Sequence, residues 1–143
     1  MRERLFRGRR MYSEEWIYST TIFAKGDRVY MPRPDTNYII TSHADIVGDI
    51  WQIECKRPDC FYRVDPSTIG EYAGEHDKNG KEIFEGDILS NKYAQHNAIC
   101  VFKKGAFGAQ FPDEFFTLAR LNGCYFEKIG NIHDNPELLE GTP

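Results

Sequence analysis

The hydrophobic positions of the chain gather in runs of four to eight residues that are rich in Tyr, Ile, Val, Phe and Thr and bounded by Gly, Pro, Asn or Asp. Few of these runs extend into the 3.6-residue repeat of an amphipathic helix, and short runs of this kind are typical of β-strands. The pattern therefore predicts a mainly β fold, a small β-barrel or sandwich. The expected strands are 16–23, 28–31, 37–41, 46–54, 61–64, 86–90, 97–103, 106–111 and 126–130.

Turn-forming residues separate these runs and mark where the chain reverses. Asn79-Gly80 is the strongest of them, because both central residues of the turn that tight hairpins favour need a positive φ. Further turns are expected at Gly26-Asp27, in residues 32–35 and in residues 103–105.

Two segments carry helix signals of different strength. Residues 115–121 fit neither a strand period nor a helix period cleanly, so both a strand and a helical turn are open there. Near the end of the chain, Asp134 or Asn135 suits the cap of a helix and Pro136 its first position. The sequence therefore predicts one short carboxy-terminal helix.

The chain has 143 residues and a mass of 16.6 kDa, enough for one domain or two small ones around a hydrophobic core. The turn-forming run Asp65-Pro66-Ser67-Thr68 precedes a part of the chain that is denser in glycine. It predicts an amino-terminal β subdomain of residues 1–65 and a carboxy-terminal subdomain of residues 66–143.

Hydropathy argues against a membrane protein. The longest uninterrupted apolar run is five residues, 98–102, whereas a spanning helix needs about 20. The first residues also lack the apolar stretch of about 7–15 residues that a secretory signal has. We expect a cytoplasmic protein without a membrane partner.

Charge is distributed unevenly along the chain. The first ten residues carry a local charge of +4 and the remaining residues a local charge of −8. Such a basic block is either a solvated or internally paired segment or an arm that binds a partner. If it forms a strand, Phe6 should be buried and most of the arginines should point to solvent; if it is an arm, proteolysis should remove it.

A nucleic-acid partner would use this basic start together with a second basic pair and nearby aromatic side chains such as Phe102, Phe107 and Tyr12. The acidic body disfavours that partner, because the sequence pI of about 5.6 is far below the value of about 9 that is typical of nucleic-acid-binding domains. The candidate nucleic-acid-binding residues are Arg2, Arg4, Arg7, Arg9, Arg10, Lys103 and Lys104.

Cysteine and histidine spacing offers only a weak metal site. Cys55 and Cys60 are separated by four residues, and His96 precedes Cys100 by four, which on a strand would place both on one face. Buried thiols of a reduced cytosolic protein are the favoured interpretation. We therefore expect no metal and no cofactor.

Four carboxylates, Asp77, Glu82, Glu85 and Asp87, fall in a glycine-punctuated central run. They suit a cation or acid–base site, but the spacing of a calcium loop is incomplete, since Lys81 and Glu82 follow Asp77-Lys78-Asn79-Gly80. We interpret them as residues that hold turns. Phosphate-loop, Gly-x-Ser-x-Gly and His-Glu-x-x-His motifs are also absent from the sequence, so we expect no enzyme.

Two longer motifs resemble a known family. Thr68-Ile69-Gly70-Glu71-Tyr72-Ala73-Gly74-Glu75-His76-Asp77-Lys78-Asn79-Gly80-Lys81-Glu82-Ile83-Phe84-Glu85-Gly86-Asp87-Ile88-Leu89 and, at the end, residues 129–140 (IGNIHDNPELLE) are similar to the signature and closing motifs of the YopX family of small phage and prophage proteins. Met1-Arg2-Glu3 and Phe6-Arg7 resemble the family's start. The resemblance implies a mainly β fold whose carboxy-terminal part, residues 66–143, is an SH3-like barrel, and it brings no catalytic or ligand residues.

Two classes of function follow from these observations. The first is a non-enzymatic, self-associating protein-interaction module, because a small aromatic-rich β fold must pair or cover its edge strands. Its partners would be further copies of the chain, or a host or phage protein. The second is a nucleic-acid-binding protein that uses the Arg-rich amino terminus.

Overall fold

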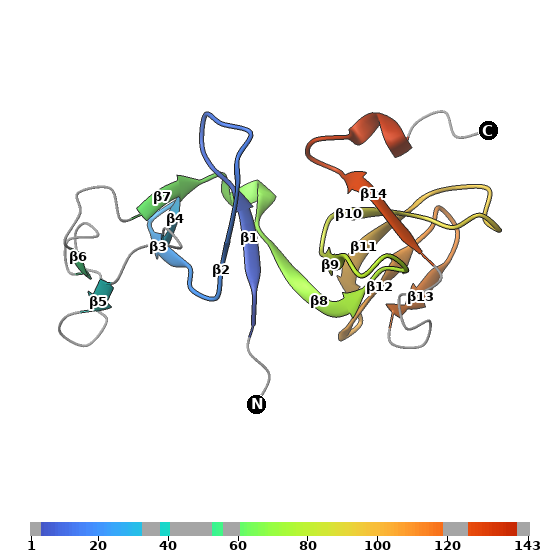
Figure 1. Ribbon diagram of the computed structural model, residues 1–143, viewed down its shortest axis with the longest axis horizontal. Coiled ribbons are helices and arrows are strands. Elements are labelled where there is room, and N and C mark those ends of the chain that lie inside the picture. Colours follow the sequence, from blue (N-terminus) through green and yellow to red (C-terminus); the bar gives the residue numbers. More distant parts are fainter. Residues whose placement is uncertain (1–3, 33–37, 41–52, 56–60, 119–125, 140–143) are drawn as a thin grey trace. The chain divides into compact units, whose positions relative to one another are not determined.

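The structure is a computed structural model that describes residues 4–32, 38–40, 53–55, 61–118 and 126–139. The chain divides into two compact units, residues 1–69 and residues 70–143. In both units the regular structure is mainly β-strand, as Figure 1 shows. The mainly β fold that the short apolar runs predict is confirmed. Within the described ranges, no helix has the length and apolar character needed to cross a membrane.

The amino-terminal unit consists of small antiparallel groups of strands. β1 (Phe6–Arg9) pairs with β2 (Trp16–Ser19), and β5 (Tyr38–Ile40) pairs with β6 (Ile53–Cys55). A three-stranded sheet has the order β3 (Phe23–Lys25), β4 (Arg28–Pro32), β7 (Phe61–Val64). A 3-10 turn, η2 (Pro66–Thr68), follows β7. The core of the unit is Ile17, Met31 and Val64, with Phe6, Ile22, Val29, Tyr62 and Ile69 packed against it.

Several strand boundaries in this unit differ from the prediction. The single strand expected over residues 16–23 is interrupted after Ser19, because the Ser19 hydroxyl accepts a hydrogen bond from the Thr21 N–H at 3.1 Å and turns the chain locally. β1 was not among the predicted strands. Most of the expected strand 46–54 lies outside the described residues, and so does most of the turn expected at 32–35.

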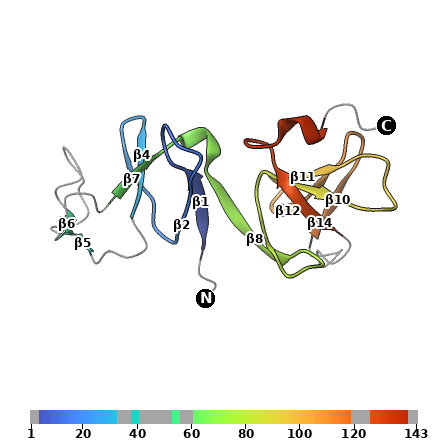
Figure 2. The ribbon, with the colours of Figure 1, turned by 45° about the horizontal axis from the view of Figure 1, so that its top comes forward.

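The carboxy-terminal unit contains a hairpin and a five-stranded antiparallel sheet. The hairpin joins β8 (Gly70–His76) to β9 (Glu82–Phe84). The sheet has the order β13 (Phe115–Thr117), β12 (Ala106–Gln110), β11 (Ala98–Lys103), β10 (Asp87–Ser90), β14 (Glu127–Asn131), with β14 beside β10 in Figures 1 and 2. The sheet and the hairpin both contribute to the buried cluster of the unit, which is Ala73, Ile83, Leu89, Ala98, Cys100, Ala109, Leu118 and Phe126.

The expected barrel is not formed by the described strands. A barrel requires pairing between the first and last strands of its sheet. The five-stranded sheet instead ends at β13 and β14, which do not pair with each other in the part of the chain that the structure describes. The prediction of a closed barrel is therefore wrong for these residues, and the SH3-like arrangement is not confirmed.

The two segments with helix signals are resolved differently. Phe115–Thr117 forms β13, while residues 119–121 lie outside the described ranges. Where a short carboxy-terminal helix was predicted, the structure has a single 3-10 turn, η3 (Pro136–Leu139). The Leu138 N–H donates to the Asn135 carbonyl three residues earlier, at 3.1 Å, a 3-10 bond rather than the bond to the fourth residue back of an α-helix.

Candidate binding site

Asp77 organises the turn between β8 and β9. Its Oδ1 accepts from the backbone N–H groups of Asn79 at 2.9 Å and Lys81 at 2.8 Å, and its Oδ2 accepts from the Lys128 N–H at 2.9 Å. Burial of Asp77 by itself raises the pKa of the carboxyl, but these three N–H donors outweigh burial and hold that pKa below its usual value. The chain reverses at Asn79-Gly80 as predicted, although Gly80 has a positive φ (83°) and Asn79 does not.

The buried side chain of Asp87 links β10 to β9 and β14 in the interior of the carboxy-terminal unit. This carboxylate is fully buried, and its Oδ2 accepts from the Phe84 N–H at 2.7 Å and lies 3.2 Å from the Lys128 ammonium. Lys128 Nζ also donates to the Glu82 carbonyl at 3.1 Å. The interpretation of Asp77 and Asp87 as structural residues is confirmed, because both carboxylates are engaged by backbone donors.

The closing motif is held by an asparagine. Asn131 Oδ1 accepts from the N–H groups of His133 at 3.0 Å and Asp134 at 2.9 Å, and Asn131 Nδ2 donates to Asp134 Oδ2 at 3.2 Å. Asn97 Nδ2, from the loop before β11, donates to the Leu138 carbonyl at 2.9 Å. These bonds engage the side chains of Asn131 and Asp134 within the unit and give this part of the motif a structural role.

The amino-terminal arginines have different environments. Arg4 is exposed and lies over the Phe6 ring at 5.1 Å, whereas Arg7 is only 2% exposed and lies over the Trp16 ring at 4.8 Å. Arg9 is half-buried, and Arg2 lies outside the described residues. The exposed Arg10 pairs with Glu15 at 3.3 Å and stacks 4.2 Å from the centre of the Tyr62 ring.

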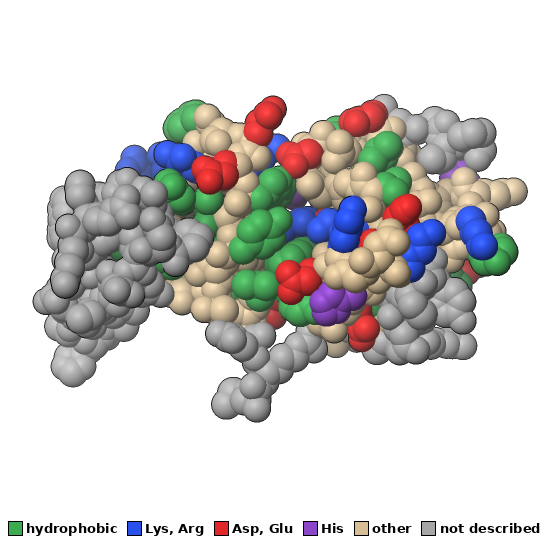
Figure 3. Space-filling model, viewed as in Figure 1, with side chains coloured by type: hydrophobic (Ala, Val, Ile, Leu, Met, Phe, Trp, Pro, Cys, Tyr) green, Lys and Arg blue, Asp and Glu red, His purple; other side chains and the backbone are tan. Residues whose placement is uncertain are grey.

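The basic start therefore forms part of a strand in which Phe6 is half-buried. Most of its described arginines contact aromatic rings of the same unit. On the face shown in Figure 3, basic and acidic side chains are interspersed over the described surface.

Lys103 and Lys104 are brought together at the tip of the β11–β12 hairpin, and both are exposed. Lys104 and Gly105 have positive φ values of 53° and 83°, as the tight two-residue turn of a hairpin requires. Lys103 Nζ donates to Gln110 Oε1 at 3.0 Å. Beside the tip, the half-exposed Phe102 packs edge to face on Phe107, directly opposite on β12, with ring centres 4.9 Å apart. We name Phe102, Lys103 and Lys104 the basic tip.

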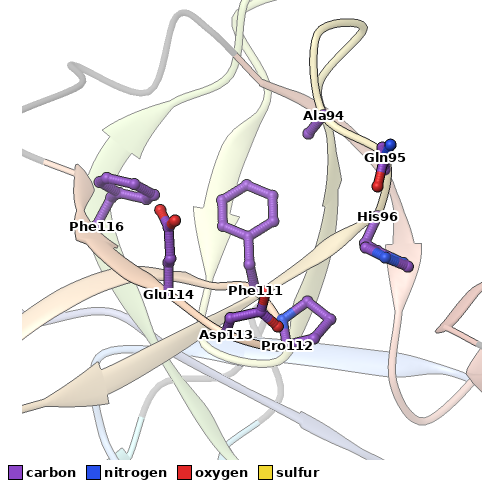
Figure 4. A pocket seen from close by; sticks show the side chains of 8 residues that line it. All are labelled: Ala94, Gln95, His96, Phe111, Pro112, Asp113, Glu114 and Phe116. Carbon is purple, nitrogen blue, oxygen red and sulfur yellow. The ribbon is translucent and has the colours of Figure 1, made fainter.

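A pocket of about 230 Å³ lies at the other end of the same hairpin. Its residues come from the loop before β11 and from the turn that joins β12 to β13, and Figure 4 shows the Phe111 ring projecting into it. The pocket residues, which we name the acidic pocket, are Ala94, Gln95, His96, Phe111, Pro112, Asp113, Glu114 and Phe116.

Hydrogen bonds from the Phe111 main chain and the Gln110 side chain fix the turn that carries the acidic side of this pocket. The Phe111 N–H donates to the Glu114 carbonyl at 2.7 Å, and Gln110 Nε2 donates to the carbonyls of Phe111 at 2.7 Å and Glu114 at 3.2 Å. The rings of Phe111 and Phe116 meet edge to face, with centres 6.0 Å apart. The pocket is therefore lined by two packed aromatic rings and by the exposed residues Asp113 and Glu114.

The sequence did not single out this pocket. Its signal is the Phe-Pro-Asp-Glu turn, in which the first carboxylates after residue 87 appear just where one strand ends and the next begins. Of the weak metal-ligand candidates that the structure describes, His96 is exposed and Cys100 is fully buried, so the two do not form a common site. Cys60 and the side chain of Cys55 lie outside the described residues, and the described part holds no group of three or more His, Cys, Asp or Glu side chains suited to a metal.

The family of the chain follows from its whole length. Residues 5–140 match the family described as YopX protein. The chain belongs to the YopX family. The match includes residues 10–65, which lie outside the two motifs, and it confirms the resemblance that the central and closing motifs carry.

Among solved structures, this YopX protein is similar to protein EF1440 from Enterococcus faecalis, known from a crystal structure. The two share 27% sequence identity and a TM-score of 0.54, over 96% of this chain and 98% of that one. No curated protein matches the chain. The comparisons thus place the chain in a family and a fold.

Proposed function

We propose that this YopX protein is a non-enzymatic protein-interaction module that associates with further copies of itself, as a prophage-encoded protein in the cytoplasm of its bacterial host. The observation that carries the proposal is the presentation of large aromatic side chains at the ends of hairpins and loops. Tyr12 is 93% exposed, Tyr93 82% and Phe102 54%. Tyrosine and other aromatic side chains supply much of the binding energy in protein interfaces.

The clearest of these side chains is Tyr12, in the turn between β1 and β2. It has a positive φ of 59°, a conformation that costs a residue with a side chain about 1–2 kcal/mol. The turn is fixed by a hydrogen bond from the Arg10 N–H to the Glu15 carbonyl at 2.9 Å and by one from the Glu15 N–H to Ser13 Oγ at 3.0 Å. An ordered turn that holds an exposed ring in an unfavoured conformation supports a role in contact with a partner.

Strand edges support self-association as the form of that contact. Within the described residues, β13 and β14 each pair on one side only. An unpaired edge is a template for another chain, and a second copy is one way to cover it. The β14 edge is held in place on its other side by the pairing of β14 with β10. Asp77 and Asp87 also hold Lys128 of this strand.

Size-exclusion chromatography with light scattering tests the proposal. The wild-type chain should elute as a dimer or larger species whose mass rises with concentration. A single monomer mass over the range from micromolar to millimolar protein would reject self-association.

Nucleic-acid binding is a second candidate, and the basic tip favours it. An exposed aromatic ring next to two lysines suits stacking on bases and contact with phosphates. Fluorescence anisotropy with single- and double-stranded DNA at about 50 and 200 mM salt tests it, because phosphate contacts must weaken as salt rises. Binding that Lys103→Glu with Lys104→Glu abolishes would support this candidate; no binding at the lower salt would exclude it.

A further inference from the structure

The basic tip and the acidic pocket lie at opposite ends of one hairpin. β11 leaves the pocket loop at Ala98 and reaches the tip at Lys103, and β12 returns from Ala106 to Gln110 beside the pocket turn. A strand of six residues spans about 20 Å. The Lys104-Gly105 turn is therefore far from the pocket of the same molecule, whereas the Lys103 side chain folds back along β12 to Gln110, beside the pocket turn.

The pocket has the chemistry of a site for an ammonium group. In the described residues, the carboxylates of Asp113 and Glu114 make no ion pair and no side-chain hydrogen bond. They line the same pocket as the rings of Phe111 and Phe116, as Figure 4 shows. A cation gains from both neighbours, since carboxylates attract it and aromatic faces add a cation–π contact.

The tip has the matching chemistry. Between Asp87 and Asp113 the sequence holds three lysines and no acidic residue. The Lys104-Gly105 turn fixes the direction of the tip, and the bond from Lys103 to Gln110 orders one of its two ammonium groups. Lys104 remains exposed, two residues after the exposed Phe102.

We propose that the acidic pocket receives the basic tip of a second copy of this chain, with the Lys104 ammonium between the carboxylates of Asp113 and Glu114. The inference rests on the proposed self-association and names the surfaces that carry it. Because each copy holds both surfaces, two copies side by side in opposite directions make the contact twice, and copies in a row make it repeatedly. Both arrangements use the same pair of surfaces.

Charge reversal tests the contact directly. The tip variant carries Lys103→Glu and Lys104→Glu, and the pocket variant carries Asp113→Lys and Glu114→Lys. Each alone should raise the dissociation constant for self-association at least about tenfold, because like charges then face each other. An equal mixture of the two variants, and a single chain with all four changes, should restore association to within about threefold of wild type, because every pair is again opposite in sign.

A matched control reverses the same number of charges elsewhere. Arg28→Glu with Lys78→Glu changes two exposed residues, one at the start of β4 and one in the turn between β8 and β9, and should leave the dissociation constant unchanged. Circular dichroism confirms that each variant is folded. If wild type is a monomer, the proposed function fails; if wild type associates and the tip and pocket variants associate equally well, only this inference is overturned. The inference is also overturned if each variant alone loses association and an equal mixture of the two does not restore it.

Discussion

The backbone N–H of Lys128 donates a hydrogen bond of 2.9 Å to Oδ2 of Asp77, which lies 51 residues earlier in the chain. The ammonium of the same lysine lies 3.2 Å from Oδ2 of the buried Asp87. Two carboxylates of the central motif therefore hold one residue of β14, one through its main chain and the other through its side chain. The central motif of the chain is therefore joined directly to strand β14 near its end.

Asp77→Asn should lower the free energy of unfolding by about 2 kcal/mol, because a neutral amide replaces a carboxylate that accepts three backbone N–H bonds. Urea unfolding followed by circular dichroism at neutral pH measures the change. Asp27→Asn is the control, since Asp27 is exposed and lies outside the proposed contact, and it should shift stability by less than about 0.5 kcal/mol. Equal stabilities for the two variants would contradict the role assigned to Asp77.

Stability should also fall in acid because of the same residue. Burial raises the pKa of Asp77, but the backbone N–H donors of Lys128, Lys81 and Asn79 lower it by a larger amount. The pKa in the folded state therefore lies below the ordinary value of 3.8. A lowered pKa stabilises the fold above the unfolded pKa, and that contribution is lost as pH falls through the folded pKa. The stability difference between wild type and Asp77→Asn should therefore shrink below about pH 4. A difference that stays constant from about pH 6 to about pH 2.5 would show that the charge of Asp77 does not matter.

The mainly β fold class can be predicted from the sequence, but strand β8 was not among the predicted strands. Gly70–His76 contains two glycines, which the sequence suggests are turn residues. In the structure, Gly74 has a φ of 85° and sits where the register of β8 against β9 shifts between Tyr72 and His76. A bulge within a strand and a turn between strands both use glycine to adopt a positive φ. The local sequence pattern therefore does not distinguish a bulge from a turn.

The site was less predictable than the fold for a different reason. Lys103 and Lys104 are neighbours in sequence, so their shared hairpin tip follows from the turn at Gly105. The acidic pocket brings together His96 and Glu114 from two separate loops, and this proximity depends on the register of β11 and β12. Lys128 as the common partner of Asp77 and Asp87 is likewise a long-range contact that periodicity does not encode.

Lys128→Met tests the buried ion pair. The substitution keeps an unbranched apolar side chain near the Phe84 ring but removes the ammonium beside Asp87, which is fully buried. We expect a loss of about 3 kcal/mol, because a buried carboxylate loses its counter-ion. Lys78→Met, at an exposed position outside the proposed contact, should change stability by less than about 0.5 kcal/mol. In a double-mutant cycle with Asp87→Asn, purely additive effects would show that the two charges are not coupled.

Gly70→Ala should be among the most damaging small substitutions in the chain. A Cβ at Gly70 would lie 2.6 Å from the Glu85 carbonyl oxygen, and this oxygen belongs to the main chain, which has little freedom to move because the Glu85 N–H is bonded to the Glu71 carbonyl at 2.9 Å. The expected loss is about 2–3 kcal/mol. Gly80→Ala separates this steric effect from backbone conformation: Gly80 has a φ of 83° but no atom within 4 Å of its Cβ position, so its loss should be about 1 kcal/mol. Thermal unfolding of both variants measures the order. A smaller loss for Gly70→Ala than for Gly80→Ala would mean that conformation, and not the close approach of β8 to Glu85, fixes glycine in this motif.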